Sequence, residues 1–87
     1  MNTFPLTITS PDGALFDGEA LGLFVRGIEG DLAVLAGHIP FITSVRAGDV
    51  HVDLPDGSTR YATTEGGLLT VAPDQVTLLA SHFVWKD

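Results

Sequence analysis

Few side chains in this sequence are of the types that carry out chemistry. The histidines are His38, His51 and His82, and the chain has no cysteine. His38 could form a Ser–His–Asp triad with Ser44 and Asp31, but no Gly-x-Ser-x-Gly turn is present to expose the serine. No two histidines have the His-Glu-x-x-His spacing of a zinc site. We therefore expect no catalytic residue, no metal site and a protein that is not an enzyme.

Phosphate-binding chemistry is missing as well. No Gly-Lys-Ser/Thr cradle is present and the single lysine is Lys86, so we expect no nucleotide or other cofactor. Four basic residues against eleven acidic ones give a net charge of −7, which repels nucleic acid and anionic lipid. No run approaches the roughly 18 apolar residues that cross a bilayer, and no secretory signal is present. These features predict a cytoplasmic protein with no direct lipid insertion.

Two polar loops that contain glycine are the candidates for binding. Glu29-Gly30-Asp31 precedes the apolar run Leu32–Leu35, and Gly37-His38-Ile39-Pro40 follows it. Four apolar residues are too few for a helix and suit a buried strand, which would carry one loop at each end. Two alternatives remain open at this point: Asp31 caps its own backbone, and His38 only holds the bend of its loop.

The rest of the chain predicts the short strands that would position these loops. Between Pro5 and Pro73 no more than eight residues pass without glycine or proline, which leaves no room for ordinary helices. Residues alternate at period two in five runs, near residues 4–8, 21–25, 50–54, 59–64 and 76–80. Turn sequences such as Pro11-Asp12-Gly13, Ala47-Gly48-Asp49 and Pro55-Asp56-Gly57 separate the runs. Residues 1–87 are therefore expected to form one antiparallel sandwich or barrel of roughly nine or ten strands.

These pieces together resemble a known family. The stretch from Glu29 to Phe41 resembles the Glu-Gly-x-x-Gly-x-Leu-Pro-Gly-His-x-Pro motif of the epsilon subunit of F-type ATP synthases, called delta in mitochondria. Flanking pieces at residues 4–19, 46–50, 65–69 and 74–80 agree in order and spacing, so the resemblance covers nearly the whole chain. Ala36 stands where the family usually has proline, and the family's C-terminal helical hairpin is absent from the sequence. The resemblance implies an all-β fold, a flattened antiparallel β-sandwich of about ten strands.

The resemblance also implies a function and partners. Members of this family are non-catalytic rotor subunits that link the gamma subunit to the c-ring and couple proton flow to ATP synthesis. Glu29, Gly30 and Asp31, together with Gly37, His38, Ile39 and Pro40, match the loops that contact an arginine-bearing ring loop at the membrane-proximal end. The implied location is peripheral, on the cytoplasmic face of the bacterial plasma membrane. Without the hairpin, inhibition and ATP sensing by that route are not expected. The alternative is a free-standing β-sandwich that binds a ligand and has no rotor role.

Two further expectations concern packing. Ile42 is expected to be a core residue, so that Ile42→Asp would prevent assembly. At the C-terminus, Phe83, Val84 and Trp85 either close the sandwich or form a bare apolar face. We expect these three residues to be only partly buried and to cause weak self-association.

Overall fold

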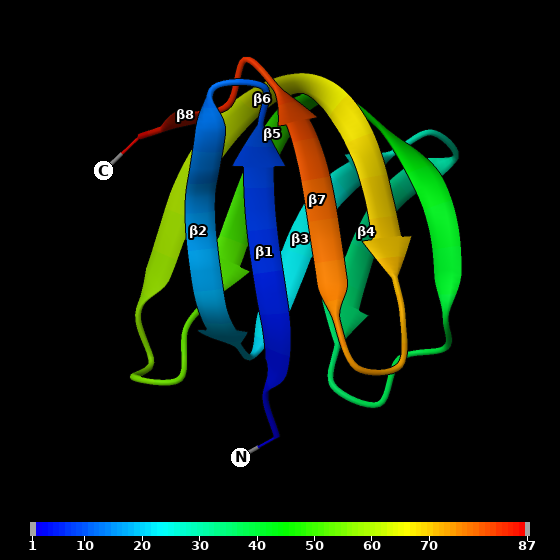
Figure 1. The fold of residues 1–87 in the computed structure, drawn as a ribbon, viewed down its shortest axis with the longest axis vertical. Helices are drawn as coiled ribbons and strands as arrows, with labels where there is room; N and C mark the ends of the chain where they lie inside the picture. Colours follow the sequence, from blue (N-terminus) through cyan, green and yellow to red (C-terminus); the bar gives the residue numbers. More distant parts are fainter. Residues whose placement is uncertain (1, 87) are drawn as a thin grey trace.

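The computed structural model of the chain describes residues 2–86, which form eight strands and no helix (Figure 1). The prediction of an all-β fold is therefore confirmed. The strands are β1 (Phe4–Ser10), β2 (Gly13–Ala20), β3 (Gly22–Gly27), β4 (Gly30–Leu35), β5 (Phe41–Asp53), β6 (Thr59–Val71), β7 (Val76–Ser81) and β8 (Val84–Trp85).

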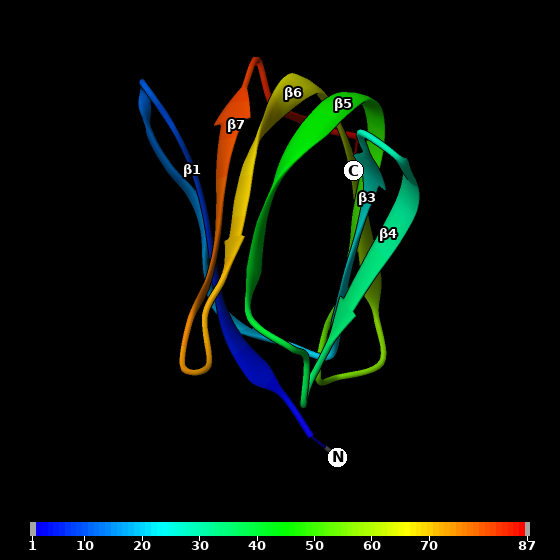
Figure 2. The ribbon, with the colours of Figure 1, turned by 90° about the vertical axis from the view of Figure 1, so that its right-hand side faces the viewer.

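The strands form one hydrogen-bonded sheet that folds over into two layers (Figure 2). Its order is β2-β1-β7-β6-β5-β3-β4, and β8 lies beside β6. The long strands β5 and β6 pass through both layers: residues 41–46 pair with 66–71 in the first layer, and residues 48–53 pair with 59–64 in the second. Because β5 and β6 each contribute one segment to each layer, the eight strands form ten strand segments. This count agrees with the expectation of about ten strands. One pairing departs from the antiparallel expectation, since β1 and β7 are parallel.

Two glycines allow the long strands to bend from one layer into the other. Gly48 in β5 has φ 149° and Gly66 in β6 has φ 135°, values that favour glycine. Beside this bend the buried hydroxyl of Thr64 donates to the carbonyl oxygen of Ser81 at 2.7 Å. The stretch around Gly48 was expected to be a turn between two strands. It is a bend within one continuous strand, because pairing with β6 is kept on both sides of it.

The core lies between the two layers and takes alternate residues from most of the strands. Its largest fully buried side chains are Leu6, Ile8, Leu23, Leu69, Leu78, Val34, Val50, Val52, Val71 and Val76. The period-two pattern is therefore confirmed for most strands. Ile42 is an exception with 67% of its surface exposed, because its neighbour Phe41 is the residue of this pair that packs against the core. The expectation that Ile42 is a core residue was wrong.

The C-terminal residues close one side of the sandwich. Phe83 is buried, Trp85 is half-buried, and only Val84 is well exposed. The indole Nε1 of Trp85 donates to the carbonyl oxygen of Leu15 at 3.4 Å, and the Arg60 guanidinium lies 3.8 Å from the centre of the indole ring. Of the two alternatives, these residues close the sandwich rather than form a bare apolar face, and together they are only partly buried, as expected. The weak self-association expected of them stays a prediction.

Candidate functional site

The two candidate loops lie at opposite ends of the molecule. The β3–β4 turn is at the end that carries the β1–β2 turn, whereas Gly37–Pro40 is at the other end beside the β6–β7 turn (Figures 1 and 2). The six residues of β4 lie between them, which at a rise of about 3.3 Å per residue is roughly 20 Å. A flat partner surface can meet only one of these loops. The family resemblance implied that both loops lie at the membrane-proximal end of the molecule. The structure corrects this expectation, because β4 separates the loops along its length.

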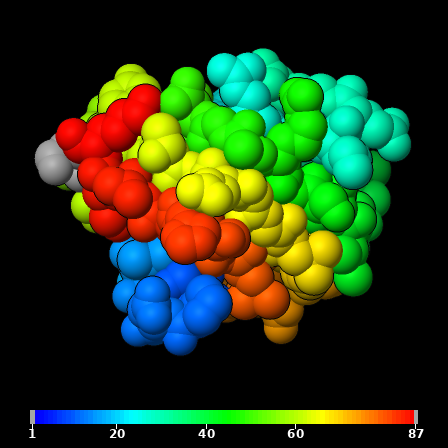
Figure 3. Space-filling model, turned by 90° about the horizontal axis from the view of Figure 1, so that it is seen from above, coloured from blue at the N-terminus to red at the C-terminus, as the bar shows by residue number. Residues whose placement is uncertain are grey.

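The β3–β4 turn is fixed to the body of the sandwich. Gly27 and Gly30 pair across the hairpin, and Ile28–Glu29 form its tip. The amide of Ile28 donates to the carbonyl oxygen of Ser44 at 3.3 Å, and Arg46 Nε donates to the carbonyl oxygen of Gly27 at 2.9 Å. Figure 3 looks onto this end of the molecule and shows the turn, in cyan, at its rim. The Glu29 side chain therefore projects from a rigid base.

Asp31 belongs to a row of alternating charges on the outer surface of the second layer. Arg26 Nη1 donates to the two Asp31 carboxylate oxygens at 3.1 and 3.4 Å. Arg26 Nη2 also lies 3.7 Å from Asp49, and Lys86 Nζ donates to Asp49 at 2.9 Å. The hydrogen bond and charge of Lys86, with Arg26 beside them, hold the pKa of Asp49 below its ordinary value. The partner of Asp31 is thus Arg26 rather than its own backbone.

Glu29 is the acidic side chain that the tip of this turn leaves to meet a partner. It is exposed, and within residues 2–86 no hydrogen bond or ion pair to its carboxylate is present. The sequence placed Glu29, Gly30 and Asp31 together in a turn, whereas Gly30 and Asp31 are the first two residues of β4 and only Glu29 lies at the tip. The pairing of Arg26 with Asp31 follows from the hairpin register, in which these two residues are directly opposite.

His38 holds the other end of the molecule together. Its Nδ1 lies 2.9 Å from the carbonyl oxygen of Leu35, and its Nε2 lies 3.0 Å from that of Ala72. The imidazole also meets the Phe4 ring edge-on at a centroid distance of 5.7 Å. Because Ala72 follows β6 in the first layer and Leu35 ends β4 in the second, the His38 ring ties the two layers together. In the same loop Ile39 remains 80% exposed.

The structure does not bring Ser44, His38 and Asp31 together as a Ser–His–Asp triad. Asp31 lies in β4, near the end of the strand away from His38, and contacts Arg26. Both nitrogens of His38 face backbone carbonyl oxygens. Among the described residues no group of three histidine, cysteine or acidic side chains could hold a metal ion. The strands of this part of the chain are its only regular elements, so it offers no helix that could span a membrane.

The fold defines the chain as a two-layered β-sandwich domain, in which Asp31 and His38 make structural contacts. Residues 3–86 match the family described as the ATP synthase delta/epsilon chain, beta-sandwich domain, and the chain belongs to this family. The alternative of an unrelated ligand-binding sandwich is therefore set aside.

Individual relatives agree with this family. The chain is 42% identical over 80 residues to an ATP synthase epsilon chain of Bacillus velezensis, a match that covers 92% of this chain. It spans only 60% of the length of that relative.

Two solved structures share the fold. A chain in the Euglena gracilis mitochondrial ATP synthase, in a structure of its OSCP, F1 and c-ring, superposes with a TM-score of 0.89 and 25% identity. That match covers 95% of this chain and 53% of the other. A chain in the central stalk and c-ring of the Tetrahymena thermophila mitochondrial enzyme has a TM-score of 0.78 and 14% identity, covering 94% and 66% of the two chains. At that identity the second likeness supports the fold alone.

Proposed function

We propose that the chain is a non-catalytic rotor subunit of an F-type ATP synthase, linking the gamma subunit to the c-ring and coupling proton flow to ATP synthesis. Family membership and the 42% identical epsilon chain support this role. The proposed location is peripheral, on the cytoplasmic face of the bacterial plasma membrane. The role is mechanical, since the sandwich transmits torque and forms or breaks no covalent bond.

The observation that carries the proposal is the exposed carboxylate of Glu29 on a turn that is hydrogen-bonded to β5. An arginine on the facing ring loop, which the family resemblance implies, would find this charge at a fixed position. Such complementarity guides encounter and fixes register more than it adds affinity, because an exposed ion pair contributes only about 0.2–1 kcal/mol. Glu29, Gly30 and Asp31 are therefore the proposed ring contact. Gly37, His38, Ile39 and Pro40 lie at the opposite end, where His38 connects the two layers, and they are left out of the proposed ring contact.

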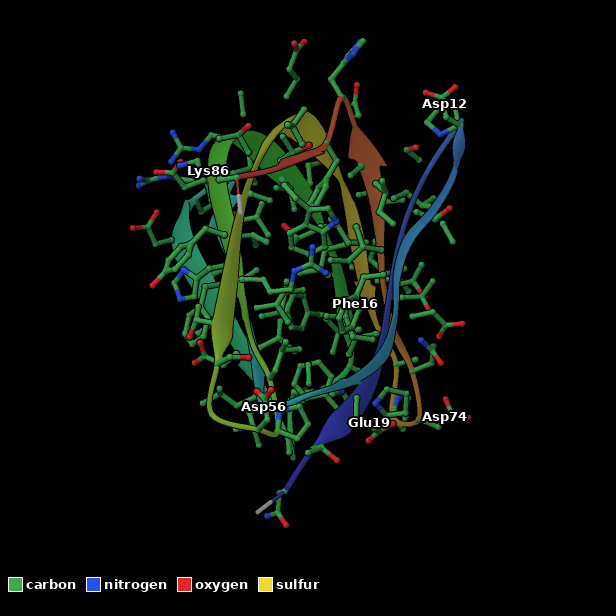
Figure 4. All side chains as sticks on the ribbon, turned by 90° about the vertical axis from the view of Figure 1, so that its left-hand side faces the viewer. Asp12, Phe16, Glu19, Asp56, Asp74 and Lys86 are labelled. Atoms are coloured by element: carbon green, nitrogen blue, oxygen red, sulfur yellow. The ribbon has the colours of Figure 1, made fainter. Side chains whose placement is uncertain are left out.

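The proposal is tested by ATP-driven proton pumping in membrane vesicles that contain the complete synthase with variant subunits. Glu29→Lys should lower pumping by about two- to fivefold, because it adds repulsion from the ring arginine to the lost attraction. Asp74→Lys is the matched control, since it makes the same charge change in the turn at the opposite end (Figure 4). Wild-type pumping by Glu29→Lys, or an equal loss in both variants, would overturn the ring contact.

A further inference from the structure

The side of the sandwich opposite the C-terminal tail is open. The tail closes its own side, where the rings of Phe16 and Trp85 lie 6.4 Å apart and Phe16 points between the layers (Figure 4). On the opposite side, β4 ends the second layer, and residues 41–43 of β5 pair only with β6 and so end the first. A hollow of about 380 Å³ lies there, lined by residues 27–32 and 41–43. A second one of about 300 Å³ adjoins it at Phe41.

Apolar side chains are concentrated around this open side. Of the eight well-exposed large apolar residues in the described chain, four line these two hollows: Ile28, Leu35, Ile39 and Ile42. Leu32 and Phe41, which face inward beside the first hollow, are only partly buried against the core. Exposed apolar side chains gathered in this way are typical of an interaction surface.

The backbone of β4 is available for pairing, in contrast to the other edge strand. The pairing of β2 with β1 has a bulge between Ile8 and Thr9, and β2 exposes the carboxylates of Asp17 and Glu19. Bulges and charges of this kind discourage edge-to-edge pairing. β4 pairs with β3 in unbroken register, and its one charged residue, Asp31, is held by Arg26. Its outer backbone groups therefore form a regular, unprotected template.

We propose that this open side accepts an extended strand of a partner protein, which pairs with β4 and places alternate apolar side chains in the hollow beside Leu32 and Phe41. An extended segment satisfies the free N–H and C=O groups of β4, whereas a helix would leave them without partners. The segment carries a lysine or arginine at the end that meets Glu29, because this chain is acidic and that carboxylate is exposed. This lateral surface is additional to the proposed ring contact at the tip of the turn.

A second copy of the chain is a poorer occupant of this surface. Each copy carries a net charge of −7, so two copies repel each other. The inward-facing residues of a second β4, Leu32 and Val34, already pack in their own core and could not fill the hollow. A partner strand with free apolar side chains meets both requirements.

The test uses the isolated chain and a synthetic peptide, acetyl-Lys-Thr-Val-Thr-Val-Thr-Val-Lys-amide, followed by NMR chemical shifts and amide hydrogen exchange. We expect saturable shifts and slowed exchange at β4, with a serine-for-valine peptide binding at least about tenfold more weakly. Ala33→Lys, an exposed substitution in the middle of β4, should weaken binding by roughly tenfold or more. Its matched control is Ala14→Lys, an exposed alanine in edge strand β2, which should bind as wild type does.

Four results would each overturn the inference. They are no binding at millimolar peptide, unchanged binding by Ala33→Lys, protection at β2 instead of β4, and protection of β4 that rises with protein concentration in the absence of peptide. The last result would identify a second copy as the occupant.

Discussion

At the scale of single residues, the two candidate loops have different tasks. Glu29 presents an exposed charge, whereas both ring nitrogens of His38 contact backbone carbonyl oxygens. The sequence identified both residues by type and neighbourhood but could not separate their tasks. One partner of His38, Ala72, is 34 residues away, and no local pattern reveals a contact of that range.

His38→Ala should lower the free energy of unfolding by about 1–3 kcal/mol, because the carbonyl groups of Leu35 and Ala72 lose their partner. Urea denaturation of the isolated chain measures this change. Glu29→Ala, an exposed substitution, should stay within about 0.5 kcal/mol of wild type. Equal stability of the two variants would show that the His38 contacts do not hold the loop.

Asp49 should make stability depend on pH in the acidic range. Its folded pKa is lowered by Lys86 and Arg26, so its contribution is present above the ordinary value of 3.8 and is lost as the pH falls through the lower folded value. Asp49→Asn should therefore be less stable than wild type near neutrality and lose less stability on acidification. Denaturation at pH 7 and pH 3 measures both effects, and parallel profiles for variant and wild type would contradict the assignment.

At the scale of elements, the alternating pattern located β1, β3 and β7 because each buries one face. It could not show that β5 and β6 are continuous. Gly48 and Gly66 suit a turn and a bend equally well, and only the unbroken pairing distinguishes the two. The sequence also could not show that Ile42 is exposed, because Phe41 and Ile42 are both apolar and the pattern does not reveal which of them faces the core.

The pairing of β6 with β7 should tolerate no side chain at Gly67. A Cβ atom there would overlap the carbonyl oxygen of Leu79, and backbone cannot move aside as a flexible side chain can. Gly67→Ala should lower the free energy of unfolding by about 1–3 kcal/mol or more. Gly18→Ala is the control, because its new methyl group would meet the Phe16 ring at an ordinary 3.7 Å. Thermal unfolding followed by circular dichroism compares them, and matching midpoints would refute the predicted overlap.

The C-terminal strand β8 should stabilise the fold through Trp85. Trp85→Ala removes the contact with Phe83, whose ring centre is 4.9 Å away, and the hydrogen bond to Leu15. We expect a loss of about 2–3 kcal/mol, below the range for a fully buried tryptophan because this residue is half-buried. Val84→Ala, on the exposed face of the same strand, should change the free energy of unfolding by less than about 0.5 kcal/mol. Guanidinium denaturation measures the free energy of unfolding of both variants. Similar losses of stability in the two variants would mean that Trp85 does not pack against the sandwich as described.

At the scale of the whole molecule, the sandwich has one closed side, one open side and two unlike ends. The family could be predicted from the sequence because its motif residues lie in loops of fixed spacing. The positions of those loops at opposite ends could not be predicted, because they depend on how β4 is oriented in the assembled layers. The acidic tip of the β3–β4 turn adjoins the open side, and the open side continues along β4 to the loop at the opposite end of the molecule.

The most direct test of the central claim is disulfide cross-linking in the complete, membrane-bound ATP synthase. Cysteine is placed at one of two exposed positions, Glu29→Cys or Ile39→Cys, and a second cysteine is placed in the polar loop of the c-ring. The chain has no cysteine of its own, so each cross-link reports a single position. We predict a cross-link to the ring from position 29 and none from position 39. A cross-link from position 39 alone, or from neither position, would contradict the proposed placement of this subunit on the ring.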